Sequence, residues 1–462
     1  MQALNKGRLS LLYLSIVTAY GFLMLAQENN WLGIGTPILI PMRIFVLLVF
    51  GYVVMKKKSL TAWILYSMFV GTEIGYDAPD FAVHLQLFSK IFLRLIKTII
   101  APLLFSTLVV GIAGHANLKQ VGRMGLKSLL YFEIVTTLAL IIGLFAINIT
   151  KAGVGIELPD AGEHAETLVG QKQTIEEVVL HIFPENIAKS IADGQVLQIV
   201  LFSILFAIGL ALVNEAKRKP MLDFTESLAE VMFKFTRIVM YFAPIGVGAA
   251  IAYTVSHMGI GILINLFQLL ATLYGALIFF LLFVLLPVAL IAKVPIRKFI
   301  KAIIEPVSIA FATTSSEAAL PKAMENMEKL GVPRKIVAFV LPTGYSFNLD
   351  GTTLYLSLAS VFVAQAAGID MGWKEQLLMV LTLMITSKGV AGVPRASLVI
   401  LLGTAASFGL PVAPIFIILG IDELMDMART SVNVIGNCLA TVVIAKWEGE
   451  YEEPEDFVEN VG

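Results

Sequence analysis

Long apolar stretches fill most of this chain, and they constrain its fold more than any other feature. A helix needs about 20 mainly apolar residues to cross the hydrocarbon core of a bilayer. Eight stretches reach or approach that length: 9–27, 36–55, 60–76, 88–113, 126–149, 195–213, 225–256 and 260–292. The pattern predicts an all-α membrane protein that crosses the bilayer many times. The first stretch has no small-residue cleavage site followed by a soluble domain, so we expect it to be a retained helix.

Composition agrees with a lipid environment. Charged residues make up 15% of the 462 residues and hydrophobic residues 58%, whereas a soluble domain usually carries about 25% charge. The net charge of −1 gives no field that would attract nucleic acid. With the single cysteine Cys438, the chain has no disulfide framework and no thiol-rich metal site.

Basic residues predict the orientation, because loops rich in Lys and Arg stay in the cytoplasm. If every stretch crosses once, the basic clusters all fall on one face: Lys6 and Arg8, Lys56–Lys58, Lys119 to Lys127, Lys217–Lys219 and Lys293 to Lys298. We therefore expect both termini in the cytoplasm of a bacterial inner-membrane protein, with residues 449–462 as an acidic tail. Arg43 lies inside the second stretch. Either it reaches an interface or that span starts later.

Beyond residue 293, Gly, Pro and polar residues interrupt the apolar pattern. Such backbone at membrane depth is tolerated where it lines a protected cavity. The run from Thr313 to Glu317 has short apolar flanks, 299–312 and 318–330, with lysines at both outer ends. This arrangement favours a hairpin that enters and leaves on the cytoplasmic side, although an ordinary loop between helices fits the same pattern.

Two further interruptions point to discontinuous helices. Asn348, Asp350 and Gly351 lie in the middle of the apolar run 336–367. Unwound carbonyls and a carboxylate at that place make an oxygen cage that suits a hard monovalent cation. The glycine-rich segment 387–395 has short apolar flanks, 377–386 and 396–410, which favour a second hairpin from the outer face.

The last apolar helix carries a polar stripe. Its members are spaced four, three, four and four residues apart, so they share one helical face: Asp422, Asp426, Arg429, Asn433 and Asn437. Arg429 could hold a carboxylate through two parallel hydrogen bonds, Asp426 could hold an ammonium group, and amides of the hairpin tips a second carboxylate. Glutamate and aspartate carry that set of groups. A purely structural Asp426–Arg429 ion pair remains the alternative.

The order of the motifs resembles one family. The motifs are Thr-Ser-Ser-Glu-Ala-Ala-Leu-Pro from residue 314, Asn-Leu-Asp-Gly-Thr from 348, Gly-Val-Ala-Gly-Val-Pro from 389 and Asp-Met-Ala-Arg-Thr-Ser-Val-Asn-Val-Ile-Gly-Asn from 426. They resemble the dicarboxylate/amino acid:cation symporters, most closely the bacterial proton/sodium-glutamate type, which are related to the excitatory amino acid transporters. The resemblance covers roughly residues 60–448. The pattern of an intramembrane hydrolase or of a channel fits less well, because no nucleophile–base pair or repeated ring of ligands is visible.

The resemblance implies an architecture. It consists of two re-entrant helical hairpins, a broken seventh family helix and, in this chain, two extra N-terminal helices within residues 1–58. The symporter core would span 59–448, with a scaffold at about 60–113 and 195–256. A transport part at about 126–149 and 260–446 would move as an elevator within a homotrimer. The chain would be no enzyme, would need no cofactor beyond coupling H+ or Na+, and would contact membrane lipid but no nucleic acid.

The resemblance also implies site residues. Those for substrate are Ser315, Ser316, Thr352, Gly392, Val393, Asp426, Arg429, Thr430 and Asn433. Those for a cation are Gly344, Asn348, Asp350, Ser387, Asn433 and Asn437. The implied function is uptake of glutamate or aspartate coupled to protons or sodium, with C4-dicarboxylate symport as the alternative and an anion channel as a more distant one.

Departures from the family pattern bear on the coupling ion. Asn437 stands where sodium-coupled members have an Asp, and Phe132 and Val135 where they have oxygen-bearing side chains. Lys388 sits beside a loop whose carbonyls would bind a further sodium. These differences favour protons, or fewer sodium ions. Glu133 and Glu317 are then candidate proton carriers, since burial raises the pKa of a carboxyl.

Overall fold

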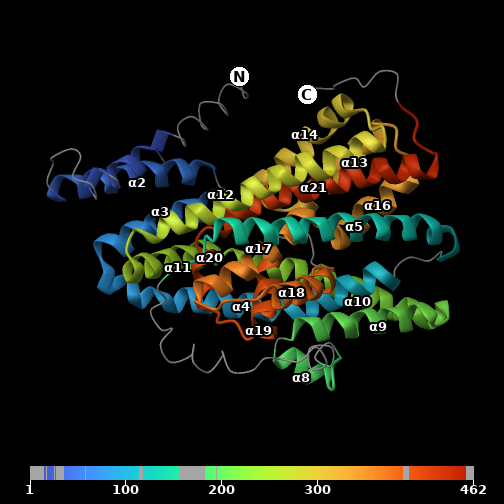
Figure 1. Ribbon diagram of the computed structural model, residues 1–462, viewed down its shortest axis with the longest axis horizontal. Helices are drawn as coiled ribbons and strands as arrows, with labels where there is room; N and C mark the ends of the chain where they lie inside the picture. The colour runs from blue at the N-terminus through green and yellow to red at the C-terminus, as the bar shows by residue number, and fades with distance from the viewer. Residues whose placement is uncertain are drawn as a thin grey trace.

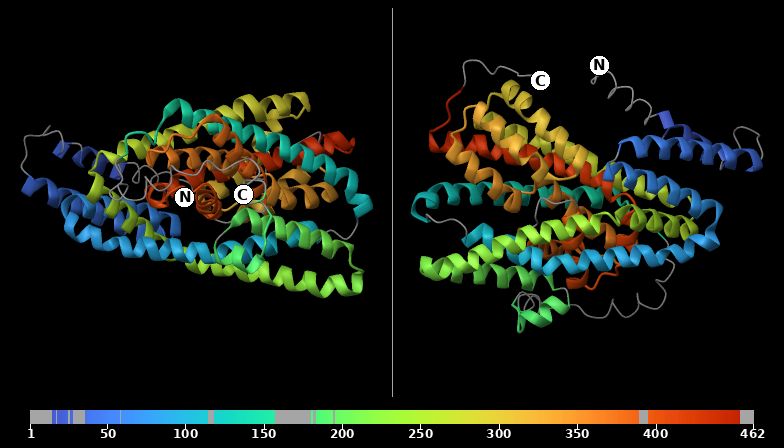
Figure 2. Two further views of the ribbon diagram at one scale, coloured as in Figure 1. Left: turned by 60° about the horizontal axis from the view of Figure 1, so that its bottom comes forward. Right: turned by 180° about the vertical axis from the view of Figure 1, so that it is seen from behind.

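The computed structural model describes the chain from residue 15 to residue 453 with several gaps. The described residues are 15–16, 18–24, 26–27, 36–57, 59–113, 118–156, 180, 183–193, 195–388 and 395–453. These parts are helical and contain no strand, as the sequence predicts. Figures 1 and 2 show long helices lying roughly side by side along the longest axis, with α2 at one edge.

The helices follow the apolar stretches closely. In chain order they are α2 Thr36–Lys57, α3 Leu60–Asp77, α4 Pro79–Ala113, α5 Leu118–Thr150, α8 Ile187–Ala192, α9 Val196–Leu212, α10 Glu215–Met240, α11 Ala243–Met258, α12 Ile262–Phe280, η1 Leu281–Leu285, α13 Leu286–Ile291, α14 Ile296–Thr313, α15 Ser316–Lys329, α16 Arg334–Phe347, α17 Asp350–Ala366, α18 Trp373–Thr386, α19 Ala396–Ser407, α20 Ala413–Leu419 and α21 Asp422–Glu448. Of the predicted first span, residues 9–14 lie outside the described residues, and residues 18–24 are helical.

The length of the helices and the apolar outer surface are those of a membrane protein. Within the described residues, five helices are long and apolar enough to cross a bilayer, or six if the bent pair α10–α11 counts as one span. Large apolar side chains lie on the outside, for example Ile149, Leu212 and Ile291, which are 79–81% exposed. Such a surface is stable against lipid tails and would aggregate in water. The chain is therefore a multi-pass membrane protein.

One predicted span is not a single helix. The stretch 225–256 divides between α10 and α11, which are bent by 48° relative to each other. The break falls at Tyr241 and Phe242, directly before Pro244. Proline has no N–H for the helical ladder, and its ring collides with the carbonyl four residues earlier, so a continuous helix is disfavoured there. The candidate span 225–256 is therefore bent at this point.

Helix contacts fall into two groups. In the first, α3 packs against α11, and α4 packs against α9, α10 and α11. In the second, α5 packs against α12 and α17, and α21 packs against α14, α16 and α17. Together with α15, which packs against α14, α16 and α21, the second group contains the described residues of the polar clusters that the sequence singled out. The exceptions are Ser387, Lys388 and Arg395, which lie between α18 and α19. Helices α17 and α21 lie in the interior of the molecule (Figure 1).

Arg43 ties α2 to α3. Its side chain is fully buried. Its Nε donates to Glu73 at 3.2 Å and its Nη2 to Asp77 at 2.6 Å. Its Nη1 contacts the Gln27 amide oxygen, and Tyr20 donates to Glu73 at 2.8 Å. The interpretation that the span starts after Arg43 was wrong, because α2 begins at Thr36. The guanidinium turns towards the carboxylates of α3, and its reach to a membrane interface stays a prediction.

Replacing Arg43 with alanine should destabilise the protein. The change leaves Glu73 and Asp77 without their cation, and breaking a buried ion pair typically costs about 3–5 kcal/mol. We expect a clearly lower midpoint of thermal unfolding for the detergent-solubilised protein. Lys219→Ala, at an exposed position of α10, is the matched control and should leave the midpoint unchanged. An unchanged midpoint in the Arg43 variant would show that this cluster does not hold α2 in place.

Candidate functional site

The polar stripe of α21 is buried and internally bonded. Asp422, Asp426 and Arg429 are at most 4% exposed. The Arg429 Nε donates to Asp426 Oδ1 at 2.9 Å, and its Nη1 donates to Asp422 Oδ1 at 3.0 Å. Thr430 donates to the same Asp426 oxygen at 3.0 Å. Among the residues that the structure describes, the buried Arg429 Nη2 has no hydrogen-bonding partner, so one edge of the guanidinium is left to bind another group.

Tyr355 supports Arg429 from the neighbouring helix α17. The Arg429 guanidinium lies over the Tyr355 ring at 4.2 Å from its centroid. The Tyr355 hydroxyl contacts Asp422 Oδ1 at 3.4 Å. Stacking of this kind fixes the plane of an arginine fork and so the direction of its hydrogen bonds. Tyr355 was not predicted, although it lies one turn beyond Thr352 on the same helical face.

A second arginine, Arg395, enters the cluster just before α19. It is 1% exposed, and its backbone has a left-handed conformation with φ of 62°. Its amide donates to Asp426 Oδ2 at 2.9 Å and its Nη2 to Glu423 Oε2 at 3.0 Å. Its Nε lies 3.8 Å from Asp422 Oδ2. The structure thus places Arg395 against carboxylates of the protein itself.

The cluster carries an unbalanced charge. Three carboxylates, from Asp422, Glu423 and Asp426, face two guanidinium groups, from Arg395 and Arg429, and all five side chains are buried. In ionised form they sum to −1. An uncompensated buried charge is unfavourable unless a further cation joins it. The arrangement can therefore accept a carboxylate at the free Arg429 edge together with an ammonium group.

Glu423 also escaped prediction from the sequence. It lies three residues before Asp426 and is 1% exposed. The signal was present, because a glutamate at that spacing belongs to the same helical face, and an ionisable residue inside an apolar span is a functional candidate by default.

Thr352 and Asn433 join α17 to the same face of α21. The Asn433 Oδ1 accepts from the Thr352 amide at 3.1 Å, and the Asn433 Nδ2 donates to the Thr352 hydroxyl at 2.9 Å. The two helices approach closely because Gly351 faces the backbone of Arg429, where a Cβ would overlap the Arg429 carbonyl. The structure thus brings together four of the predicted substrate residues, namely Thr352, Asp426, Arg429 and Asn433, and places Thr430 beside them.

The predicted break in the seventh family helix is present. Helix α16 ends at Phe347 and α17 begins at Asp350, with Asn348 and Leu349 between them. Asn348 and Asp350 are fully buried. Asn348 donates to Asp350 Oδ2 at 3.3 Å and accepts, through its carbonyl, from Asn437 Nδ2 at 3.0 Å. Gly344 faces the Asn437 amide from one turn earlier.

Three side-chain oxygens at this break have no hydrogen-bonding partner within the described part of the chain. They are the Oδ1 atoms of Asn348, Asp350 and Asn437, all fully buried. Buried acceptors are normally paired, and oxygens gathered around a carboxylate are the ligands that hard cations prefer. We call Asn348, Asp350 and Asn437 the oxygen cradle. Its chemistry fits the predicted cation site.

Lys388 and Glu133 meet at the edge of this region. The Lys388 Nζ lies 3.2 Å from Glu133 Oε2, donates to Thr136 Oγ1 at 2.7 Å and to the Phe347 carbonyl at 3.3 Å. The Glu133 side chain is 46% exposed. The predicted proton carrier Glu133 is thus one partner of an ion pair. The neighbouring Ser387 is buried and its hydroxyl has no partner.

The first hairpin has the expected helix–turn–helix form. Helices α14 and α15 pack against each other, and Asn326 donates to the Ala302 carbonyl at 2.8 Å across them. Thr314 forms the turn with φ of 51°, and Ser315 caps α15 by accepting from the Ala318 amide at 3.3 Å. Ser316 is buried, and its hydroxyl has no partner. Glu317 follows it on α15 and is partly exposed. Gly392 and Val393, at the predicted second tip, lie outside the described residues.

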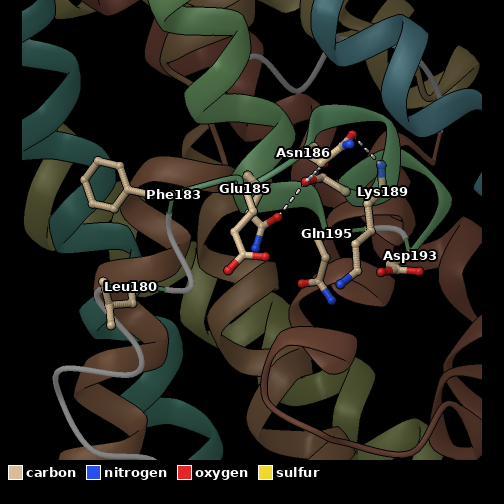
Figure 3. Close-up of a pocket in the computed structure, with 9 residues that line it drawn as sticks. Leu180, Phe183, Glu185, Asn186, Lys189, Asp193 and Gln195 are labelled. Atoms are coloured by element: carbon tan, nitrogen blue, oxygen red, sulfur yellow. Dashed lines mark hydrogen bonds between the residues drawn. The ribbon is translucent and has the colours of Figure 1, made fainter.

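A surface pocket lies elsewhere. It has a volume of about 260 Å³ and is bounded by α8 and the start of α9. Its lining includes Glu185, Asn186, Lys189 and Asp193 (Figure 3). None of its lining residues belongs to the polar cluster or the oxygen cradle, and α8 lies at the edge of the molecule (Figure 1). Asn186 caps α8 by accepting from the Ala188 and Lys189 amides, so the side-chain oxygen of Asn186 is already hydrogen-bonded to the protein.

Residues 60–447, which include the whole cluster, match the model of the sodium:dicarboxylate symporter family. The chain belongs to this family. The predicted resemblance is thereby confirmed, and the chain is a symporter rather than an enzyme.

Several relatives align with most of this symporter. It is 44% identical over 408 residues to a proton/sodium-glutamate symport protein of Bacillus caldotenax, covering 86% of this chain and 97% of the relative. It is 42% identical over 412 residues to the proton/glutamate-aspartate symporter of Escherichia coli strain K12, covering 86% and 94%. It is 41% identical over 401 residues to a C4-dicarboxylate transport protein of Pseudomonas syringae, covering 86% and 89%.

Proposed function

We propose that this symporter takes up glutamate or aspartate, coupled to protons, sodium ions or both. The observation that carries the proposal is the buried Arg429, which is held by Asp422, Asp426 and Tyr355 and retains one unpartnered donor. The side-chain carboxylate of the substrate would accept a hydrogen bond from the remaining Arg429 donor, Nη2. The substrate ammonium would bind Asp426 and offset the negative charge that the substrate side-chain carboxylate brings. The α-carboxylate would bind near Ser316, at the amino end of α15, where free amides favour an anion.

The C4-dicarboxylate alternative is less well supported. Succinate, fumarate and malate have two carboxylates but no ammonium group, so binding them would add negative charge beside Asp426. A cluster that already sums to −1 penalises such a substrate. Relatives named as glutamate symporters and relatives named as C4-dicarboxylate transporters align over similar lengths. The comparisons therefore do not separate the two substrates, and the buried carboxylate of Asp426 is what favours the amino acid.

We assign the two contact groups of helices to two functional parts. The group of α3, α4, α9, α10 and α11 would form a scaffold within a homotrimer. The group of α5, α12 to α17 and α21 would carry the substrate across the membrane by an elevator motion, with the segment 373–410 as the gate. The contacts within each group support this division. The protein would reside in a bacterial inner membrane with both termini in the cytoplasm, and residues 1–58 would add two helices to the scaffold side.

Ion coupling would use the oxygen cradle and one carboxyl. The unpartnered Oδ1 atoms of Asn348, Asp350 and Asn437 support a cation there. The neutral Asn437 supplies less charge than a carboxylate, which favours fewer sodium ions. Glu317, beside the substrate-facing turn of the first hairpin, is the stronger candidate proton carrier, because Glu133 is engaged by Lys388.

The test is uptake of radiolabelled glutamate into proteoliposomes under imposed gradients. One set of vesicles receives a proton gradient without sodium and another a sodium gradient at equal pH. Saturable uptake that unlabelled aspartate inhibits far better than succinate would support the proposal. Succinate uptake with no response to glutamate would replace it with the C4-dicarboxylate function. Absence of gradient-driven uptake of either compound would refute both.

A further inference from the structure

Lys388 occupies an unusual place for a lysine. It lies just after α18, yet its side chain is 13% exposed and its Nζ reaches the interior. The ammonium contacts oxygens from two other helices, namely the Thr136 hydroxyl and Glu133 carboxylate of α5 and the Phe347 carbonyl at the end of α16. It also lies close enough to Asp350 to interact with that carboxylate electrostatically.

This set of ligands resembles the shell of a bound cation more than a surface ion pair. A neutral hydroxyl, a backbone carbonyl freed by a helix break and a carboxylate are oxygen donors of the kind that hold alkali cations. The Thr136 hydroxyl donates its own proton to the Phe132 carbonyl at 2.7 Å, so its lone pairs are turned towards the ammonium. Since Glu133 is half exposed, its pairing alone would contribute little and does not explain why the lysine is buried.

The position of the ammonium has an electrostatic consequence for the oxygen cradle. Asp350 is fully buried and pairs through one oxygen with a neutral amide. An ionised carboxylate in that place needs a cation nearby. Lys388 supplies a positive charge that cannot dissociate, whereas a free ion would have to be bound in every transport cycle.

We propose that the Lys388 ammonium is a tethered cation, which permanently fills a position between α5 and the break of α16 and α17 that would otherwise bind a monovalent cation. This inference rests on the proposed ion-coupled function and makes it more specific, because it assigns one fewer dissociable sodium ion to each transport cycle. Lys388 acts as a positioning residue, since it contacts Thr136 and Phe347 and touches no substrate group.

The test replaces Lys388 with methionine, which keeps the length of the side chain and removes its charge. The position should then become available to sodium. For the purified protein in detergent, we expect the unfolding midpoint to rise by about 3 °C or more when sodium chloride replaces choline chloride at equal ionic strength. The wild type and Lys374→Met, which changes an exposed lysine of α18, should show a smaller rise. This readout needs no substrate.

A second readout uses glutamate binding. The slope of log Kd for glutamate against log sodium concentration should become steeper by about one in Lys388→Met, because one more ion is linked to binding. If the wild type binds no glutamate, the proposed function fails. The thermal measurement still shows whether the Lys388 ammonium takes the place of a sodium ion.

The outcomes are separable. A folded Lys388→Met protein whose sodium response equals that of the wild type would overturn the inference. If this variant does not fold, Lys388→Gln, which can keep the hydrogen bonds without the charge, takes its place under the same criterion. Failure of both variants to fold even in sodium would also overturn it, since a sodium ion should replace the missing charge.

Discussion

Changing Arg429 to alanine should abolish uptake of glutamate and aspartate. The guanidinium is held by Asp422 and Asp426 and stacked on Tyr355. Its loss removes the partner of the substrate carboxylate and leaves three buried carboxylates against Arg395 alone. Removing one partner of a buried charge pair costs about 3–5 kcal/mol, which corresponds to an affinity loss of more than about 100-fold. Initial uptake rates in proteoliposomes at several glutamate concentrations measure the effect.

Two further variants make this experiment specific. Arg334→Ala removes an arginine whose side chain is 88% exposed and should leave uptake unchanged. Arg429→Lys keeps the charge but loses the planar fork, so we expect weak residual uptake. Uptake by Arg429→Ala at the wild-type rate and KM, with the protein reconstituted in equal amounts, would refute the assignment of the pocket to α21.

Exchanging Asp426 for asparagine should change which substrates are accepted. The amide has the same shape, and its single oxygen can still accept from the Thr430 hydroxyl or from the Arg395 amide, which bond different oxygens of Asp426, but it no longer attracts an ammonium group. We expect the KM for glutamate and aspartate to rise about 100-fold, since hydrogen bonds to charged groups contribute about 1.5–3 kcal/mol. Inhibition by succinate should weaken far less, or strengthen, because one repulsive charge is gone.

Competition against labelled glutamate and direct uptake of labelled succinate measure this shift. Asp370→Asn, at an exposed position after α17, is the control for loss of a carboxylate at the surface. An equal loss for glutamate, aspartate and succinate would contradict an ammonium-binding role. It would leave Asp426 as a structural partner of Arg429, the alternative that the sequence already allowed.

Local chemistry made several parts of this fold predictable. The turn at Thr314 and Ser315 and the break at Asn348 occur where small, polar side chains offer caps and free carbonyls inside apolar runs. The stripe of α21 followed from helical spacing alone, since Asp422, Asp426 and Arg429 lie three and four residues apart. These features depend on near neighbours in the chain, which the sequence displays directly.

Features that depend on contacts between distant segments were not predictable in the same way. The burial of Arg395 depends on its contacts with Asp426 and Glu423, which lie 31 and 28 residues further along the chain. The burial of Arg43 depends on α3, which supplies its partners Glu73 and Asp77. The division of 225–256 had a local signal in Pro244, but proline also occurs inside other helices of this chain, such as Pro306 in α14, so the residue type alone did not decide it.

Asn433 connects Thr352 to the oxygen cradle. Its side chain bonds Thr352 in the substrate pocket, while its backbone carbonyl accepts from Asn437, a member of the oxygen cradle, at 2.9 Å. A ligand that orders the Asn437 side chain would therefore help to order the Asn433 carbonyl. It would also help to order the Asn433 side-chain amide, which positions Thr352. Such a connection is thermodynamically reciprocal: the factor by which a cation raises the affinity for substrate is the factor by which substrate raises the affinity for the cation. A single asparagine thus connects the proposed substrate pocket to the proposed cation site, and we expect each ligand to raise the affinity for the other.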